Sequence, residues 1–439
     1  MLRSRRLTRA YWLGVLLVFT YTPVAVILLV QHSRFRNVAT EVSVIAGVLA
    51  VSFLVVALAL PTRVHSILAS FGIENVLRTH RVVAVIATVL VIVHIAAALI
   101  GDPRGFRIFD LSNAPRPVWA ATLATAALLA LVVSALRRRR AKPRYEGWRM
   151  VHIGLAVLVL VFAGLHIFWL GGLHSPAMRA CYAALAVAAL LIAGRRWIWL
   201  PVRSHLRSYV VENVRPVSGN AVTVAVRAHE HGGLPFRAGQ FAWLKIGTSP
   251  FVFEEHPFTI ASTAERPHIK EFTIKALGDF SELLIGLRPG RRVYLDGPYG
   301  RFTVDGIRSK GFVFIGGGVG ITPIISILRT LADRGDEGSH LLLVGARTEE
   351  DLMLREELTE LRSRLDLTIV EVVESHPPEW GGESGRIDSG LLDRVLPRRA
   401  RHHDYYVCGP PAMVVAVGRQ LRERGISTKR IHTEQFDVV

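Results

Sequence analysis

Four histidines stand in two apolar segments of this chain, where an ionisable side chain is costly. His80 and His94 belong to the segment 80–100, and His152 and His166 belong to the segment 150–170. Ionisable residues inside a membrane span are rare and usually serve a function. Imidazole ligates metals and haem iron, so these four residues are candidate ligands.

The spacing of the histidines indicates which of these functions they serve. The interval from His80 to His94 equals the interval from His152 to His166. In an α-helix, this interval of about 14 residues ends about 40° short of four turns and rises about 21 Å, so each pair shares one helix face at two depths. Two spans running in the same direction then place His80 beside His152 and His94 beside His166. Facing imidazoles of this kind predict two b-type haems, each iron held axially by two histidines.

Other uses of the histidines remain open at this point. A metal transport site or a proton relay would call for carboxylates, and neither segment has one in its core. A histidine near the end of a span can also reach the interface or pack against a neighbouring helix. The equal spacing on two segments favours the haem interpretation.

The histidine segments are two of six apolar segments that are long enough to cross a membrane. The predicted spans are about 11–31, 41–60, 80–100, 118–136, 150–170 and 177–199. Each has close to the ~20 residues that cross the hydrocarbon core. A hydrophobic content of 51% supports a membrane protein. The first apolar stretch exceeds the roughly 7–15 residues of a signal-peptide core, so we expect it to be an uncleaved anchor.

The net charge of +18 is distributed as membrane topology requires and does not indicate nucleic-acid binding. Lys and Arg concentrate in the amino-terminal tail, in 61–81, in 137–149 and after the sixth span. Because cytoplasmic loops carry the Lys and Arg excess, we expect both termini in the cytoplasm and the spans in the plasma membrane. The two cysteines, Cys181 and Cys408, predict no disulfide framework.

The composition changes near residue 200, and a soluble region follows. Short alternating runs between 209 and 304 predict a small antiparallel β-barrel. A lysine, a hydroxyl and backbone N–H groups at a helix start could neutralise a diphosphate. The barrel segment contains the motifs HPFT and KALGDFS, with His256, Pro257, Phe258, Thr259, Lys275 and Ser281.

A strand, a glycine loop and a helix follow in GFVFIGGGVGITPIISILRTL. Glycine lets a backbone approach a phosphate closely, and a helix amino terminus favours negative charge. The third glycine of a GxGxxG motif is replaced by Ile321. Strands at about 340–344, 367–373, 404–407 and 429–433 predict an open α/β nucleotide-binding domain. Its candidate phosphate-binding residues are Gly316, Gly317, Gly318, Gly320, Thr322 and Pro323.

Three further elements complete this candidate site. Arg347 follows the strand HLLLVG, where NAD-binding domains carry an acidic residue for the ribose 2′-hydroxyl. A cation there suits a 2′-phosphate, which predicts a preference for NADPH over NADH. The other two elements are the strand end Cys408, Gly409 and Pro410, and the aromatic Phe436 near the carboxy end.

Taken in order, these segments resemble the NADPH oxidase and ferric reductase-like transmembrane family, and its bacterial NADPH-oxidase-like members in particular. The histidine pairs, HPFTIAS, KALGDFS, the glycine loop and CGPP carry the resemblance over nearly the whole chain. It implies a multidomain membrane protein with a six-helix haem-binding bundle over 1–204. An antiparallel β-barrel FAD domain would follow over 205–306, and an open α/β NAD(P)-binding domain over 307–439.

The resemblance also implies roles for single residues. In that family the segment at His256–Thr259 lies along the isoalloxazine and ribityl chain of FAD, and the positions of Lys275 and Ser281 contact its pyrophosphate. The loop 316–323 holds the nicotinamide nucleotide. The resemblance gives catalytic positions to Cys408, beside the nicotinamide, and to Phe436, over the flavin ring. One departure is Ala98, which stands where the animal oxidases carry another histidine.

The implied activity is electron transfer from cytoplasmic NADPH or NADH through FAD and two haems to an acceptor outside. Dioxygen giving superoxide is the expected acceptor. A ferric chelate is the alternative, because several arginines could form a basic outer mouth. These arginines are Arg34, Arg36, Arg104, Arg107 and Arg116. An electron-donor module for an outside partner protein and a haem or metal transporter remain rival interpretations.

Overall fold

A computed structural model describes residues 2–30, 37–101, 112–141, 145–170, 176–218, 220–276, 278–397 and 400–436. Contacts divide the chain into two compact units, Met1–Pro201 and Val202–Val439. The boundary proposed from sequence at 204 lies close to this division.

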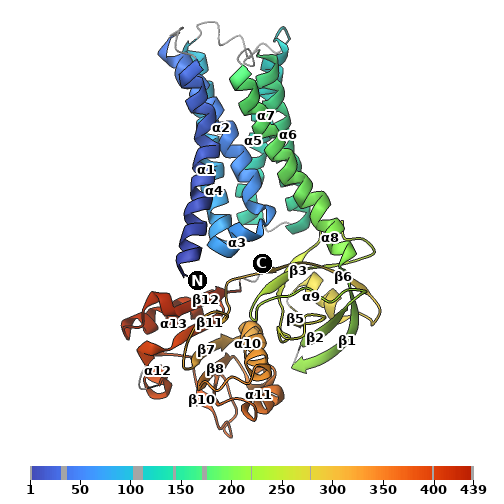
Figure 1. The fold of residues 1–439 in the computed structure, drawn as a ribbon, viewed down its shortest axis with the longest axis vertical. Coiled ribbons are helices and arrows are strands. Elements are labelled where there is room, and N and C mark those ends of the chain that lie inside the picture. Colours follow the sequence, from blue (N-terminus) through green and yellow to red (C-terminus); the bar gives the residue numbers. More distant parts are fainter. Residues whose placement is uncertain are drawn as a thin grey trace. The chain divides into compact units, whose positions relative to one another are not determined.

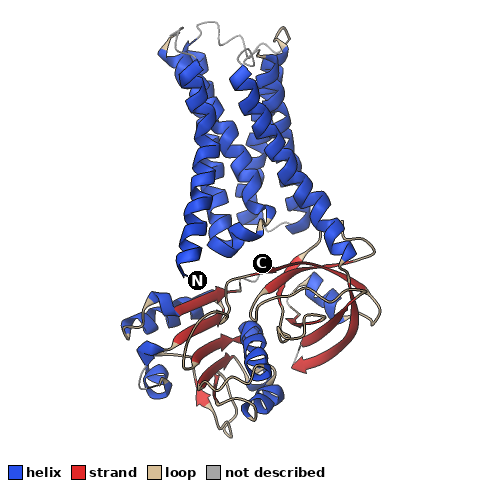
Figure 2. Ribbon diagram, viewed as in Figure 1, coloured by secondary structure: helices blue, strands red, loops and turns tan. Residues whose placement is uncertain are grey.

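The first unit is built from long helices (Figure 1). Its described part contains helices and loops only (Figure 2). The long helices are α1 (Leu2–Val30), α2 (Val38–Ala59), α4 (Ile73–Gly101), α5 (Arg116–Ala141), α6 (Tyr145–Trp169) and α7 (Pro176–Gly194). Six stretches among the described residues are long and apolar enough to cross a membrane, and each overlaps a predicted span. The six-span prediction is therefore confirmed.

Two neighbouring pairs of helices position the histidines. Helix α2 packs along α4, and α5 packs along α6. The amino end of α2 is capped by Asn37, whose side chain accepts a hydrogen bond of 2.8 Å from Ala39 N. At the carboxyl end of α4, an ideal Cβ on Gly101 would lie 2.7 Å from Thr40 Oγ1 in the first turn of α2. Glycine therefore allows the carboxyl end of α4 to meet the amino end of α2.

Shorter elements at the connections were not predicted. Helix α2 continues into the 3₁₀ turn η1 (Leu60–Thr62), and α3 (His65–Phe71) precedes α4. Helix α7 passes through a π-helical turn, η3 (Arg195–Trp199), into α8 (Leu200–Leu206). Arg195 on that turn donates to Thr62 O at 3.0 Å and to Arg63 O at 3.3 Å, which ties the end of α7 to the end of α2.

The second unit begins with the predicted barrel. Its sheet has the strand order β4-β3-β6-β1-β2-β5, and neighbouring strands pair antiparallel. Ala261 N, just after β4, donates to Glu271 O on β5 at 2.7 Å and so joins the two ends of the sheet. The elements are β1 (Tyr209–Ser218), β2 (Ala221–Ala228), β3 (Phe241–Ile246), β4 (His256–Thr259), β5 (Ile269–Lys275), α9 (Asp279–Ile285) and β6 (Arg292–Tyr299).

A parallel sheet with helices follows, as predicted. Its strand order is β10-β9-β8-β7-β11-β12, and the order reverses between β7 and β11. The strands are β7 (Phe312–Gly317), β8 (His340–Ala346), β9 (Leu367–Val373), β10 (Glu383–Ser384), β11 (Asp404–Gly409) and β12 (Ile431–Gln435). The helices of eight or more residues are α10 (Ile321–Asp333), α11 (Arg355–Arg362) and α13 (Pro411–Glu423), and α12 (Ser389–Val395) is shorter.

Helix α10 joins the barrel to the parallel sheet within one continuous core. The core cluster contains barrel residues such as Ala261 and Phe302 together with Ile324 and Leu328 of α10. Polar contacts add to it, because the buried Ser326 hydroxyl donates to Ser262 O at 2.9 Å. The boundary proposed at 306 and 307 falls in the segment between β6 and β7.

A buried arginine strengthens the same junction. Arg329 on α10 donates through Nη1 to Glu271 on β5 at 2.6 Å and through Nη2 to Glu357 on α11 at 2.7 Å. The Arg329 side chain is 12% exposed, so its two carboxylate partners offset the cost of burying the charge. Barrel and parallel sheet therefore form one compact unit.

Candidate functional site

The four histidines lie on two helices that face each other. His80 and His94 belong to α4, and His152 and His166 belong to α6. The ring centroids of His80 and His152 are 6.4 Å apart, and those of His94 and His166 are 6.2 Å apart. The ring planes are inclined at 63° in the first pair and 75° in the second. The rings thus meet as two pairs, one at each level of the helices.

These distances fit a metal ion held between two imidazoles. A metal–imidazole bond is about 2.0–2.1 Å long, and the nitrogen lies about 1.2 Å from its ring centre, which separates two opposed ring centres by about 6.4 Å. Simple aromatic packing also covers the range of about 4.5–7 Å. The ring nitrogens therefore decide between ligation and packing.

Three of the four histidines contact a backbone carbonyl through Nδ1. A carbonyl oxygen only accepts, so Nδ1 donates its proton and Nε2 keeps its lone pair. Metal-ligating histidines are oriented in this way by a second group. The partners are Ala57 O for His80, Ser43 O for His94 and Pro117 O for His166, at 2.9, 2.8 and 2.8 Å. The donor set fits two haem irons, each between a pair of imidazoles.

Helix α2 also makes room for His94. An ideal Cβ on Gly47 would lie 2.9 Å from His94 Nδ1. The buried Ser43 hydroxyl lies 3.0 Å from the same nitrogen and donates to His94 O at 3.0 Å. Sequence reasoning missed both residues, because α2 contains no histidine that would have drawn attention to it. The one available signal was a glycine inside a span, where it costs about 1 kcal/mol relative to alanine.

The HPFT segment forms strand β4, which pairs with β3. Leu244 lies opposite His256, and Phe241 lies opposite Thr259. The His256 ring lies 4.3 Å from the Phe280 ring of α9, and the Phe258 ring is stacked 6.1 Å from it. Pro257 is exposed. Strand pairing and the ring of Phe280 therefore bring HPFT against the end of KALGDFS.

Lys275 and Ser281 both have protein partners in this structure. Lys275 Nζ lies 2.7 Å from Asp351 Oδ1, beyond β8. The lysine lowers the pKa of the Asp351 carboxyl below its usual value. The Ser281 hydroxyl accepts from Gly278 N at 3.0 Å and donates to Gly278 O at 2.7 Å, which caps α9. A role with a pyrophosphate remains a proposal for both side chains.

The glycine loop and the CGPP segment meet directly. An ideal Cβ on Gly320 would lie 2.3 Å from Cys408 O, and one on Gly317 would lie 2.6 Å from Met413 Sδ. Gly409 has φ of +155°, and a Cβ there would lie 3.1 Å from Gly317 O. Larger residues would separate the two segments. Both segments stand at the carboxyl ends of β7 and β11, where the strand order reverses and open α/β sheets bind ligands.

The other members of the glycine loop are placed by the start of α10. Gly316 is buried in β7, and Gly318 has φ of +55°, a left-handed conformation that suits glycine. The Thr322 hydroxyl donates to Val319 O at 2.8 Å, so it caps the turn before α10. Pro323 is buried in the first turn of α10. The loop is thus fixed by the fold of α10.

Cys408 and Phe436 approach the loop in different ways. The Cys408 side chain is fully buried, and this burial, with the nearby Glu434 carboxylate, raises the pKa of its thiol well above the usual value. The thiol is therefore protonated in the core, and the carbonyl of Cys408 faces Gly320. Phe436 N donates to Gly409 O at 3.3 Å, so the backbone of Phe436 lies beside the CGPP segment. Pro410 of that segment lies against the glycine loop, because an ideal Cβ on Gly317 would be 3.2 Å from Pro410 Cδ.

Arg347 lies beyond the end of β8, the strand next to β7. Gly345 of β8 pairs with Gly317 of β7, so Arg347 follows β8 two residues past the level of Gly317. Its backbone carbonyl accepts from Ser375 N at 2.8 Å, and its side chain is exposed. The guanidinium is accessible to a ligand at this edge of the sheet.

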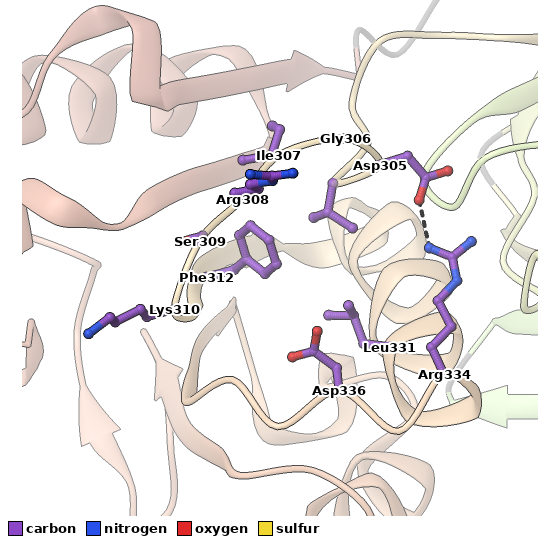
Figure 3. A pocket seen from close by; sticks show the side chains of 11 residues that line it. Asp305, Gly306, Ile307, Arg308, Ser309, Lys310, Phe312, Leu331, Arg334 and Asp336 are labelled. Atoms are coloured by element: carbon purple, nitrogen blue, oxygen red, sulfur yellow. Dashed lines mark hydrogen bonds and ion pairs between the residues drawn. The ribbon is translucent and has the colours of Figure 1, made fainter. Parts of the chain in front are cut away.

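A pocket of about 520 Å³ opens at the other edge of the parallel sheet (Figure 3). It lies beside Phe312, the first residue of β7, and Leu331 near the end of α10. Arg334 lines it and bonds Asp305 at 2.7 Å, which fixes the segment between β6 and β7 (Figure 3). The pocket is separate from the glycine loop and contains none of the predicted site residues.

Three family models match consecutive parts of the chain. A ferric reductase-like transmembrane component matches residues 46–163, an FAD-binding domain matches 207–303, and an oxidoreductase NAD-binding domain matches 314–419. The first match contains His80, His94 and His152 and ends before His166. Together they give the chain the architecture of the NADPH oxidase and ferric reductase-like proteins, and they make it an oxidoreductase.

Individual relatives match about half of the chain or less. The propane 2-monooxygenase reductase component of Rhodococcus jostii (strain RHA1) is 33% identical over 52% of this chain and 62% of its own length. The NADH-cytochrome b5 reductase 2 of Meyerozyma guilliermondii is 29% identical over 37% of this chain and 56% of its own length. The chain thus spans about three fifths of the length of these relatives.

Solved structures are also similar to part of the chain. The FAD/NAD-binding domain of the nitric oxide dioxygenase from Vibrio cholerae is 22% identical, with a TM-score of 0.47, over 52% of this chain and 98% of that one.

Proposed function

We propose that this chain, an oxidoreductase with the NADPH oxidase and ferric reductase-like architecture, carries electrons from cytoplasmic NADPH through FAD and two b-type haems to dioxygen outside. The membrane-spanning helices and the FAD- and NAD-binding domains establish the coarser function, which is transmembrane electron transfer. The haems, the direction and the acceptor are the proposal.

The observation that carries the proposal is the double pair of imidazoles on α4 and α6. The ring separations of 6.4 and 6.2 Å suit bis-histidine iron at both levels. The carbonyl contacts leave Nε2 of His80, His94 and His166 free of the proton that would prevent ligation. Two redox centres at two depths shorten the distance that an electron must cover through lipid.

The cofactors supply the redox chemistry, because flavin accepts a hydride pair and releases single electrons, and haem iron carries one electron at a time. The chain supplies placement. Gly317, Gly320 and Gly409 keep two backbone segments close enough to receive a dinucleotide at the switch point of the sheet. Phe436, whose N–H donates to Gly409 O, would cover the flavin ring.

The barrel and the parallel sheet need a fixed relation for this transfer. A hydride donor and acceptor react only in a near-attack geometry, at about 3–3.5 Å. The shared core and the contacts of Arg329 with Glu271 and Glu357 hold HPFT and the glycine loop in one compact unit. We assign these contacts to keeping the two nucleotide sites in register.

The ligation of the outer haem iron by two histidines would limit where an acceptor can take its electron. An iron held by two histidines would have no open coordination position, so the acceptor would take its electron at the haem edge. Dioxygen is small and neutral and can reach an edge between helices. Ala98, one turn beyond His94, stands where the animal oxidases carry a histidine near their oxygen site, and this departure favours the ferric-chelate alternative. Four of the five arginines that could serve a ferric chelate, Arg34, Arg36, Arg104 and Arg107, lie outside the described residues, and Arg116 begins α5.

The first experiment counts haems. Purified full-length chain is expected to yield two b-type haems by pyridine haemochrome assay. His94→Ala or His166→Ala should leave one haem, which NADPH still reduces. One haem or none in the wild-type chain contradicts the proposal.

The second experiment identifies the acceptor. During NADPH turnover in air, cytochrome c reduction that superoxide dismutase suppresses is the expected result. If dismutase leaves the signal unchanged while ferric citrate is reduced rapidly under argon, the chain is a ferric-chelate reductase.

A donor module for a partner protein is the second candidate. The names of the relatives favour it, because several are reductase components, although each matches only about half of this chain. It predicts that purified chain with NADPH transfers few electrons to dioxygen or ferric citrate until a partner is added.

A further inference from the structure

The carbonyl contacts of the histidines follow one register. Ser43 and Ala57 are separated on α2 by the same interval as His80 and His94 on α4. The antiparallel helices thus repeat the same contact after nearly four turns. Helices α5 and α6 make one such contact, between Pro117 O and His166 Nδ1. The same interval, taken along both of these helices, pairs Leu131 O with His152.

A fourth contact of this kind is absent from the described residues. The Ser134 hydroxyl donates to Leu131 O at 2.8 Å. His152 Nδ1 is buried and has no hydrogen-bond partner among the residues that the structure describes. Of the four predicted iron ligands, His152 is therefore the one whose Nδ1 has no described carbonyl partner.

Packing holds His152 instead. The Trp148 ring, one turn earlier on α6, lies 5.0 Å from the His152 ring at an interplanar angle of 37°. Trp148 Nε1 donates to Ser134 O at 3.2 Å. The Arg138 guanidinium lies 4.3 Å from the Trp148 ring centre and 4.6 Å from that of Tyr145, so a cation covers the indole. Arg138, Trp148 and His152 form a column at the His80–His152 level.

We propose that Trp148 is the positioning residue of His152, and that Ser134 keeps Leu131 O from this imidazole so that the inner haem has a raised reduction potential. The inference rests on the proposed haem function. A carbonyl at Nδ1 makes a histidine a stronger donor, which stabilises ferric iron. Without that bond, and with the charge of Arg138 nearby, the reduced haem is favoured. Electron transfer from the flavin to the inner haem would then be thermodynamically more favourable.

Ser134→Ala tests the register argument. The change removes the hydroxyl and leaves Leu131 O open to His152. In a redox titration, the reduction potential of the inner haem should fall by about 59 mV. This corresponds to a tenfold change in the equilibrium constant for electron transfer from the inner to the outer haem. The haem count should stay at two. The same titration in a His94→Ala background assigns the inner haem.

Trp148 is tested by spectroscopy, because the EPR signal of a low-spin ferric haem depends on the angle between its two imidazole planes. Trp148→Leu should change the inner signal and leave the outer signal unchanged, whereas Trp148→Phe, which keeps a ring over His152, should stay close to wild type. Trp169→Leu is the matched control, since Trp169 lies on the same helix beyond His166 and is 38% exposed.

The two tests separate this inference from the function. Wild-type chain with fewer than two haems overturns the proposed function and this inference with it. Two haems, with wild-type potentials in Ser134→Ala and wild-type EPR signals in Trp148→Leu, overturn the inference alone. If Trp148→Leu does not fold, the potential of Ser134→Ala decides.

Discussion

Gly47 on α2 lies against His94 on α4, so closely that a Cβ at Gly47 would stand 2.9 Å from Nδ1 and 3.1 Å from Cε1 of the imidazole. Real Cβ atoms do not approach a neighbouring atom to 2.9 Å. His94 Nδ1 also donates to Ser43 O, which lies on α2 with Gly47. The ring cannot retreat without losing that bond. Gly47 therefore belongs to the site although it offers no ligand atom.

Gly47→Ala should displace His94 and loosen the outer haem. Loss of an orienting contact costs metal sites about 10–100-fold in affinity. Haem content should fall from two toward one after detergent extraction, with the inner haem retained. Gly154→Ala is the control, because nothing lies within 4 Å of an ideal Cβ there, although Gly154 is two residues from His152. Equal haem loss in both variants would contradict the assignment.

Lys275 should contribute to FAD affinity through its charge. It now pairs with Asp351 at 2.7 Å, but both side chains are about a third exposed, so this pair is weak and open to exchange with a diphosphate. Lys275→Met should raise the dissociation constant of FAD about tenfold, as expected for one charge-assisted hydrogen bond. Asp351→Asn should not weaken FAD binding. Unchanged FAD affinity in Lys275→Met, measured by flavin fluorescence, would remove Lys275 from the site.

Arg347 should select NADPH. Arg347→Ala should raise KM for NADPH about tenfold and KM for NADH less than twofold, because a lost charge-assisted bond affects the cofactor with a 2′-phosphate alone. Steady-state kinetics with both nucleotides make the comparison. Arg362→Ala, an exposed arginine on α11, is the control. Equal changes for the two nucleotides would mean that Arg347 does not contact the phosphate.

Because Lys270 is buried, the stability of the second unit should rise as the pH rises above neutrality. This lysine is fully buried on β5, with Nζ 2.9 Å from Pro267 O and 4.0 Å from the Phe236 ring centre. Burial lowers its pKa from 10.5 to about 7. Between these values the unfolded chain binds the proton and the folded chain does not, so stability rises with pH by up to about 1.4 kcal/mol per pH unit.

Lys270→Met should therefore stabilise the unit near pH 7 and below and remove much of the alkaline rise. The temperature of flavin release from the full-length chain, measured between pH 6.5 and 9.5, reports this change. Lys310→Met, at an exposed lysine, is the control. Parallel pH curves for wild type and Lys270→Met would contradict the prediction.

Much of the architecture could be predicted because its signals are local. A run of about 20 apolar residues defines a span wherever it lies, and all six spans were found. Alternating runs in the barrel and buried runs in the parallel sheet gave the strands, including β9 at Leu367–Val373. The last strand begins at Ile431, two residues later than predicted, because Ser427 caps a 3₁₀ turn over Thr428–Arg430.

The sequence by itself determined that His80 and His94 share one face of α4, and His152 and His166 one face of α6, because helix geometry converts their equal spacing into direction and depth. Only the tertiary structure decided what surrounds each ring. Ser43 O, Ala57 O and Pro117 O are backbone atoms that every residue carries, so no side-chain pattern marks them. Gly47, Ser134 and Trp148 act through contacts between helices, and such contacts depend on how two helices pack.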